Sequence, residues 1–82
     1  MNEQIRLAIE NTMVVGDSEV FLHAVNADNG RGILMISHGG LDTLINIEAG
    51  EFVALPDTGD YLTVLEVRET HVSLLVSEGR MH

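Results

Sequence analysis

Residues 61–76 read YLTVLEVRETHVSLLV, two apolar runs on either side of the polar segment Arg68-Glu69-Thr70. Both runs are rich in Val, Leu and other side chains that suit a pleated, half-buried surface. Short runs of this kind, bounded by turn residues, are typical of paired β-strands. The sequence therefore predicts a β-hairpin here, with strands over about 61–67 and 72–76.

The same pattern continues toward the N-terminus. Further short apolar or alternating runs occupy residues 5–9, 13–15, 20–25, 34–36, 44–47 and 52–55. Turn residues separate them, and Asn29-Gly30 is a strong hairpin signal because both residues tolerate positive φ. Residues 2–11 have a second interpretation, since Asn2 could cap a short helix. The sequence predicts an all-β fold, a small barrel or sandwich of about eight short strands.

Length and composition limit the class of protein. The chain has 82 residues, 45% of them hydrophobic, and a formal net charge of −9 from thirteen carboxylates and four Arg. We expect a single domain over 1–82, and a chain this small gains from self-association because it buries only about 60–65% of its unfolded surface. The absence of Cys excludes disulfides and thiolate zinc sites. No apolar run approaches the length of a membrane span and no secretory signal is visible, so we expect a cytoplasmic location without membrane attachment.

An internal repeat is suggested when the chain is shifted by forty residues. The shift pairs Ile5 with Ile45, Leu7 with Ile47, Phe21 with Tyr61, Leu22 with Leu62, Leu34 with Leu74 and Ile36 with Val76. Pseudo-repeats over about 5–40 and 45–80 would each supply four strands to one core, around a pseudo-two-fold axis. Two unrelated β patterns of similar spacing would also correlate in this way, so a chance match stays open.

The second half carries an ordered set of motifs. Residues 44–47 (LINI) lead to Gly50-Glu51, residues 52–57 (FVALPD) follow, and residues 63–72 (TVLEVRETHV) form the hairpin. In the first half the closest segment is 13–17 (MVVGD). This order resembles the carbon storage regulator (CsrA) proteins over roughly residues 5–37 and 44–77. The resemblance implies a small β-protein whose family members form intertwined dimers and bind GGA-containing RNA through basic side chains.

The basic residues depart from that family pattern. Glu48 and Ala49 stand where the resemblance implies a basic pair, and in the first half only Arg6 lies nearby. Arg31 and Arg68 fall at or beside the expected hairpin tips, so Arg6, Arg31 and Arg68 are the candidate RNA contacts. An acidic protein repels phosphate backbones at long range. The resemblance therefore supports the fold more than the RNA activity.

Other candidate chemistry is weak. His23, His38, His71 and His82 include no pair at metal-binding spacing on one element, although facing strands could bring His23 and His71 together. The three aromatic residues, Phe21, Phe52 and Tyr61, are expected in the core and not on a stacking surface. The sequence predicts no catalytic residue, no cofactor and no metal site.

Three functions remain in competition. The leading hypothesis is a non-enzymatic regulatory or structural β-protein that acts by oligomerisation and protein binding, because short β-domains expose strand edges that can pair with another chain. The first alternative is a CsrA-like RNA-binding translational regulator. The second is an acidic inhibitor that presents carboxylates like the phosphates of a nucleic acid.

Overall fold

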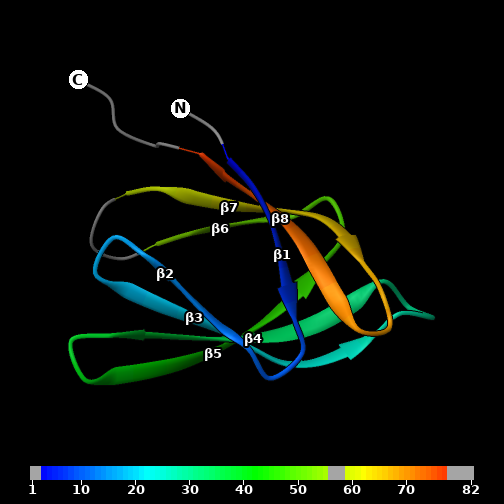
Figure 1. The fold of residues 1–82 in the computed structure, drawn as a ribbon, viewed down its shortest axis with the longest axis horizontal. Helices are drawn as coiled ribbons and strands as arrows, with labels where there is room; N and C mark the ends of the chain where they lie inside the picture. Colours follow the sequence, from blue (N-terminus) through cyan, green and yellow to red (C-terminus); the bar gives the residue numbers. More distant parts are fainter. Residues whose placement is uncertain (1–2, 56–58, 78–82) are drawn as a thin grey trace.

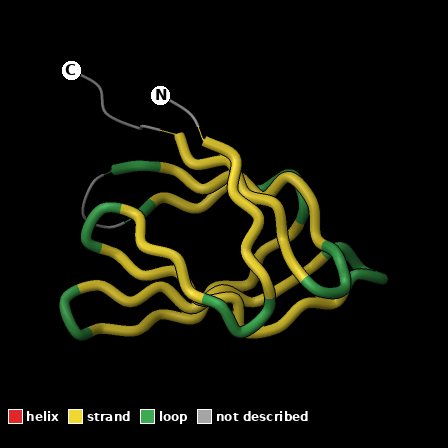
Figure 2. The backbone as a smooth tube through the Cα atoms, viewed as in Figure 1, coloured by secondary structure: helices red, strands yellow, loops and turns green. Residues whose placement is uncertain are grey.

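The computed structural model describes residues 3–55 and 59–77, and within them it is built from strands and short loops (Figure 2). The strands are β1 (Glu3–Ala8), β2 (Thr12–Val15), β3 (Ser18–Asn26), β4 (Arg31–His38), β5 (Leu41–Glu48), β6 (Phe52–Ala54), β7 (Tyr61–Val67) and β8 (His71–Ser77). The all-β prediction is confirmed, and residues 3–8 form a strand and not a helix. The described part of the chain contains no helix that could cross a membrane.

The strands form two four-stranded antiparallel sheets (Figure 1). One has the order β1-β8-β7-β6 and the other β2-β3-β4-β5, which we call the 1876 sheet and the 2345 sheet. They pack as a sandwich, and in the described residues they do not close into a barrel. The chain passes from one sheet to the other between β1 and β2 and again between β5 and β6, so each half of the sequence contributes to both sheets.

The strand order has an internal two-fold relation. If β1 to β4 are matched with β5 to β8, the order β1-β8-β7-β6 becomes β5-β4-β3-β2, which is the order of the other sheet. The registers agree as well: Ile5 lies opposite Leu74, and their counterparts Ile45 and Leu34 lie opposite each other. Each half therefore gives its first strand to the sheet formed by the other half.

The ungapped shift is wrong for β3 and β7. Thr12 lies opposite Phe21 and its counterpart Phe52 lies opposite Thr63, so Phe21 corresponds to Thr63 and not to Tyr61. By the same offset Leu22 corresponds to Val64. The reason lies in the number of residues between paired positions. Four residues separate Val14 from Glu19, but six separate their counterparts Ala54 and Tyr61. The later hairpin is two residues shorter in compensation, with six residues between Val25 and Gly32 and four between Val67 and Val72.

The two halves also share a backbone feature where the chain changes sheets. Glu10 has a φ of 66° and Gly50, forty residues later, a φ of 94°. The Glu10 N–H donates to the carbonyl oxygen of Leu22 at 2.8 Å, and the Gly50 N–H donates to that of Val64 at 2.7 Å. Because side chains disfavour this left-handed region, Glu10 carries backbone strain that Gly50 avoids.

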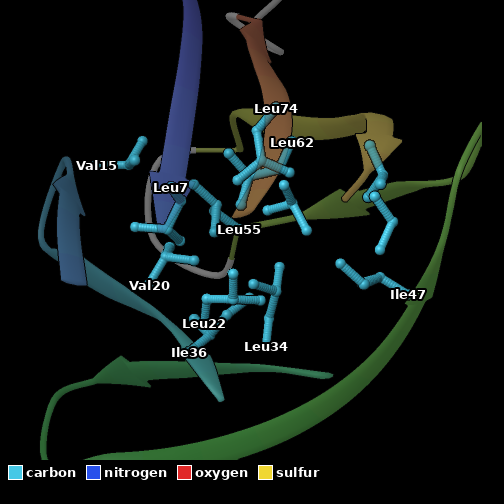
Figure 3. Close-up of a cluster of buried hydrophobic side chains, with 13 residues drawn as sticks. Leu7, Val15, Val20, Leu22, Leu34, Ile36, Ile47, Leu55, Leu62 and Leu74 are labelled. Atoms are coloured by element: carbon cyan, nitrogen blue, oxygen red, sulfur yellow. The ribbon is translucent and has the colours of Figure 1, made fainter. Parts of the chain in front are cut away.

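The core lies between the sheets (Figure 3). It is aliphatic, and its buried members are Leu7, Val15, Val20, Leu22, Leu34, Ile36, Ile47, Leu55, Leu62, Val64, Val67, Val72 and Leu74. Period-two alternation places them on the inner faces of the strands. The expectation that every aromatic residue joins this core is wrong: Phe52 is 66% and Tyr61 37% exposed. Their register puts both on the outer face of the 1876 sheet, where their rings meet edge to face at 5.5 Å.

Candidate protein-binding surface

A row of apolar side chains crosses the outer face of the 2345 sheet. Phe21 of β3 lies opposite Met35 of β4, and Met35 lies opposite Leu44 of β5. Phe21 and Met35 are half-buried, whereas Leu44 is 63% exposed. We call these three residues the outer row. Because no other sheet covers this face, the outer row is apolar surface in contact with solvent.

The row ends on β5, which is an edge strand. β5 spans eight residues and pairs only with β4 within its sheet. His38 and Leu41 flank the two-residue turn Gly39-Gly40, in which both glycines have positive φ, as a type I′ hairpin requires. In such a hairpin the two flanking residues exchange both main-chain hydrogen bonds, and hydrogen-bonded and non-hydrogen-bonded pairs then alternate along the strands. The backbone N–H and C=O groups of Asp42, Leu44, Asn46 and Glu48 therefore point away from β4.

The inner face of β5 borders a narrow apolar space. This space, which we call the β5–β6 slot, has a volume of about 240 Å³ and is lined by Ile36, His38, Leu41, Thr43, Ile45 and Ala54. Leu41 is 70% exposed, so β5 presents solvent-exposed leucines on both of its faces. A space of this size exceeds the roughly 150 Å³ in which an apolar cavity holds benzene, so the slot accommodates one large aliphatic or aromatic side chain.

Sequence reasoning predicted a strand at residues 44–47 but did not identify which of its side chains are exposed. In LINI the residues Leu44 and Ile45 are adjacent, and adjacent strand residues point to opposite faces. One of them must then lie outside a one-sided core. The presence of apolar residues on both faces of this strand was the available signal, but it did not indicate which face the second sheet covers.

The candidate RNA contacts occupy two places. Arg6 of β1 and Arg68 of the β7–β8 turn line one hollow of about 620 Å³, together with Glu66 and His71. Arg68 donates a hydrogen bond to the Glu66 carboxylate. This bond, aided by the positive charge of Arg68, lowers the pKa of Glu66 below its ordinary value and raises that of Arg68. Part of the positive charge in the hollow is therefore already neutralised by the protein itself.

Arg31 lines a different hollow, of about 550 Å³, formed by β3, β4 and β5. The internal two-fold relates the two hollows. Arg31 corresponds to His71, and Glu48 corresponds to Ala8. Arg31 lies opposite Glu48, just as His71 lies opposite Ala8. The counterpart of Arg6 is Asn46 and that of Arg68 is Asn26. The hairpin tips that border the hollows lie at the same end of the molecule (Figure 1). The structure thus places Arg6 and Arg68 in one hollow, whereas Arg31 lies in the symmetry-related hollow, whose lining within the described residues has no other Arg.

The histidines remain separate in the described residues. His23 is exposed beside Phe21, with 6.2 Å between ring centroids, and His71 lies in the other sheet next to Thr70, with 3.1 Å between Nδ1 and the hydroxyl oxygen. Facing strands therefore do not pair His23 with His71. Within 3–55 and 59–77 no three His, Asp or Glu side chains cluster as metal ligands would. His82 lies outside the described residues.

Comparison with known proteins gives no relative. No protein-family model matches the chain, and searches of curated proteins and of solved structures found no match.

Proposed function

We propose that this chain is a non-catalytic β-protein that acts by binding another protein through the outer row and the adjoining edge strand β5. The observation that carries the proposal is the exposure of Leu41 and Leu44, 70% and 63%, on opposite faces of one edge strand. Apolar side chains gathered on an unprotected face and edge are typical of interaction sites. The surface therefore fits contact with another chain better than permanent exposure to water.

The composition of β5 supports this function. Edge strands that must stay unpaired are commonly protected by short length, by Lys or Pro, or by a bulge. β5 is eight residues long, pairs with β4 without a register shift, and contains neither Lys nor Pro. Asp42 and Glu48 are its only charged residues, and like charges of this kind limit aggregation without blocking a specific partner.

Affinity capture from cells that express the chain tests the proposal. The wild type is compared with the double variant Leu41→Gln/Leu44→Gln, and Phe52→Gln is the matched control because Phe52 is equally exposed on the other sheet. We expect the double variant to lose a partner that the wild type and Phe52→Gln retain. Equal retention by all three folded proteins, or stoichiometric turnover of a substrate by the purified chain, would contradict the proposal.

Self-association is part of the same proposal. The expected homo-oligomer would add the burial that an 82-residue chain lacks. Light scattering across a concentration series measures the molecular mass directly. A mass that stays at 8.9 kDa at all concentrations limits the function to binding a different protein. A partner that is captured at low salt and released sharply as salt rises favours the acidic nucleic-acid mimic.

RNA binding is a second candidate function, favoured by the placement of Arg6 and Arg68 in one hollow. The resemblance to the CsrA proteins suggests a GGA-containing stem-loop as the probe. A gel shift at about 50 mM and about 200 mM salt is informative because each phosphate contact contributes a slope of about −0.7 to −0.9. We expect Arg6→Gln/Arg68→Gln to reduce that slope by about 1.5. The absence of any shift at low salt excludes this function.

A further inference from the structure

We infer that β5 takes up an extended segment of its protein partner as a fifth strand of the 2345 sheet, and that this segment alternates apolar residues with Lys or Arg. The inference rests on the proposed function and specifies how the partner is recognised. Three features of β5 support it: its unpaired main chain, its apolar inner face and the charge around it.

The first feature is the unpaired main chain of β5, the longest edge strand. Among the edge strands, β2 has four residues, β6 three and β1 six, whereas β5 has eight. Its outward N–H and C=O groups belong to Asp42, Leu44, Asn46 and Glu48, which are all exposed. The carbonyl oxygen of Glu48 already accepts a hydrogen bond from the Glu51 N–H at 3.0 Å. A strand added along this edge therefore pairs with both groups of Asp42, Leu44 and Asn46, as in other cases of β-strand addition.

The inner face supplies a pocket for alternate side chains. Successive residues of an added strand point to opposite faces of the sheet. Those on the inner side meet Leu41, Thr43 and Ile45, which line the β5–β6 slot of about 240 Å³. The inner residues of the partner segment are therefore apolar, and one of them has the size of Leu or Phe.

The charge around β5 determines which residues of the partner segment are favoured on the outer face of the sheet. Between Arg31 and Arg68 the chain has no Arg or Lys but six carboxylates: Asp42, Glu48, Glu51, Asp57, Asp60 and Glu66. Two of them, Asp42 and Glu48, lie at the two ends of the outward-facing part of β5 with Leu44 between them. Glu48 already lies opposite Arg31 of β4, whereas Asp42 lies opposite Ser37. An added strand with Lys or Arg opposite Asp42 therefore gains a cross-strand charge pair, whereas an acidic residue there is destabilising.

The same charges disfavour a second copy of this chain at the edge, so the proposed self-association would use the face that carries the outer row and not the edge of β5. If two β5 strands pair antiparallel about Ile45, Asp42 of one chain lies opposite Glu48 of the other, and this contact occurs twice. Like charges directly opposite in a sheet are destabilising. Pairing about Leu44 avoids this contact, because Asp42 then lies opposite Asn46. In either register, however, two copies that each carry a net charge of −9 repel each other. A different protein with a basic segment is therefore the occupant that charge favours.

A synthetic peptide tests the inference. The probe is a labelled nonapeptide of alternating Lys and Leu, and its binding to the full chain is followed by fluorescence anisotropy. We expect saturable binding that weakens at least tenfold when alternate peptide nitrogens are methylated, because two or more main-chain hydrogen bonds are then lost. The Glu-Leu peptide of the same length should not bind. Equal binding of the methylated peptide, or of the Glu-Leu peptide, would overturn the inference.

Proline variants of the protein supply the matched test. Leu44→Pro removes an outward N–H without breaking a bond to β4, and Pro is tolerated at such edge positions. Val14→Pro is the control, because Val14 occupies the outward position next to the β2–β3 turn on the opposite edge of the same sheet. We expect Leu44→Pro to weaken peptide binding about three- to tenfold and Val14→Pro to leave it unchanged. Asp42→Asn should weaken binding about twofold to fivefold, and Glu48→Gln should weaken it less, because Glu48 already lies opposite Arg31.

The outcomes separate this inference from the proposed function. If Leu41→Gln/Leu44→Gln loses the cellular partner but Leu44→Pro keeps it, the surface binds a protein without strand addition and only the inference fails. If neither variant loses the partner, both fail. Should Leu44→Pro be unfolded by circular dichroism, the methylated peptide on the wild type decides the matter.

Discussion

Truncation of a single core leucine tests the packing and the register together. Leu34 is completely buried in β4 and lies opposite Leu22 and Ile45 on the inner face of the sheet. Leu44, on the neighbouring strand, is 63% exposed on the outer face. The same substitution, Leu to Ala, should therefore have very different effects at these two positions.

The magnitudes follow from burial. At a fully buried position Leu→Ala costs about 3–5 kcal/mol, from lost transfer free energy and the cavity that remains. At Leu44 only about a third of the side chain is covered, so the cost is about 1 kcal/mol or less. A domain of this length has about 4–12 kcal/mol of stability in total, so Leu34→Ala removes a large fraction of it.

Urea denaturation followed by circular dichroism measures the difference. With a slope of about 1 kcal/mol/M, we expect Leu34→Ala to lower the midpoint by about 3 M or to unfold the protein. Leu44→Ala should lower it by less than about 1 M. Equal losses at the two positions, or a larger loss at Leu44, would refute the register in which β4 and β5 are placed.

Three further predictions concern the backbone and charge. Glu10→Gly should raise the free energy of unfolding by about 0.5 kcal/mol, since the relief of left-handed strain outweighs the conformational entropy that Gly adds to the unfolded chain. Gly50→Ala should lower the free energy of unfolding by about 1 kcal/mol, because Ala introduces that strain. Opposite signs in urea titrations would contradict both expectations. Because Arg68 lowers the pKa of Glu66 below 4.5 in the folded state, the contribution of Glu66 to stability is present above that pH and lost as pH falls through the folded pKa. Glu66→Gln should thus differ from the wild type at pH 7 and match it at low pH, and a difference that persists in acid would contradict the assignment. Added salt should raise the thermal midpoint by screening the net charge of −9, and a fall would show that attractive pairs dominate.

The local sequence was sufficient for the strands and for much of the repeat. The β-branched runs and Gly turns predicted the eight strands, because period-two alternation and turn chemistry are local properties. The shift that pairs Ile5 with Ile45 and Leu34 with Leu74 also agrees with the strand registers, because Ile5 lies opposite Leu74 and Ile45 lies opposite Leu34. The offset of Phe21 was wrong because a longer β6–β7 connection shifts β7 by two residues, and an ungapped comparison has no means of detecting it.

The candidate surface depended on tertiary information. Whether Leu44 or Ile45 faces the core is decided by the second sheet, which covers one face of β5 and leaves the other open. Phe52 and Tyr61 were assigned to the core on hydrophobicity, yet their register places them outside. Likewise, Arg6 and Arg68 are far apart in sequence and line the same hollow only because β1 pairs with β8.

Amide hydrogen exchange along β5 tests the central claim most directly. In the free protein we expect fast exchange at Asp42, Leu44, Asn46 and Glu48 and slow exchange at Thr43, Ile45 and Ile47. Addition of the Lys-Leu peptide should slow the first group at least tenfold and leave the outward amides of β2 unchanged. Uniform protection of β5 in the free protein, or peptide binding without protection of Leu44 and Asn46, would contradict the account.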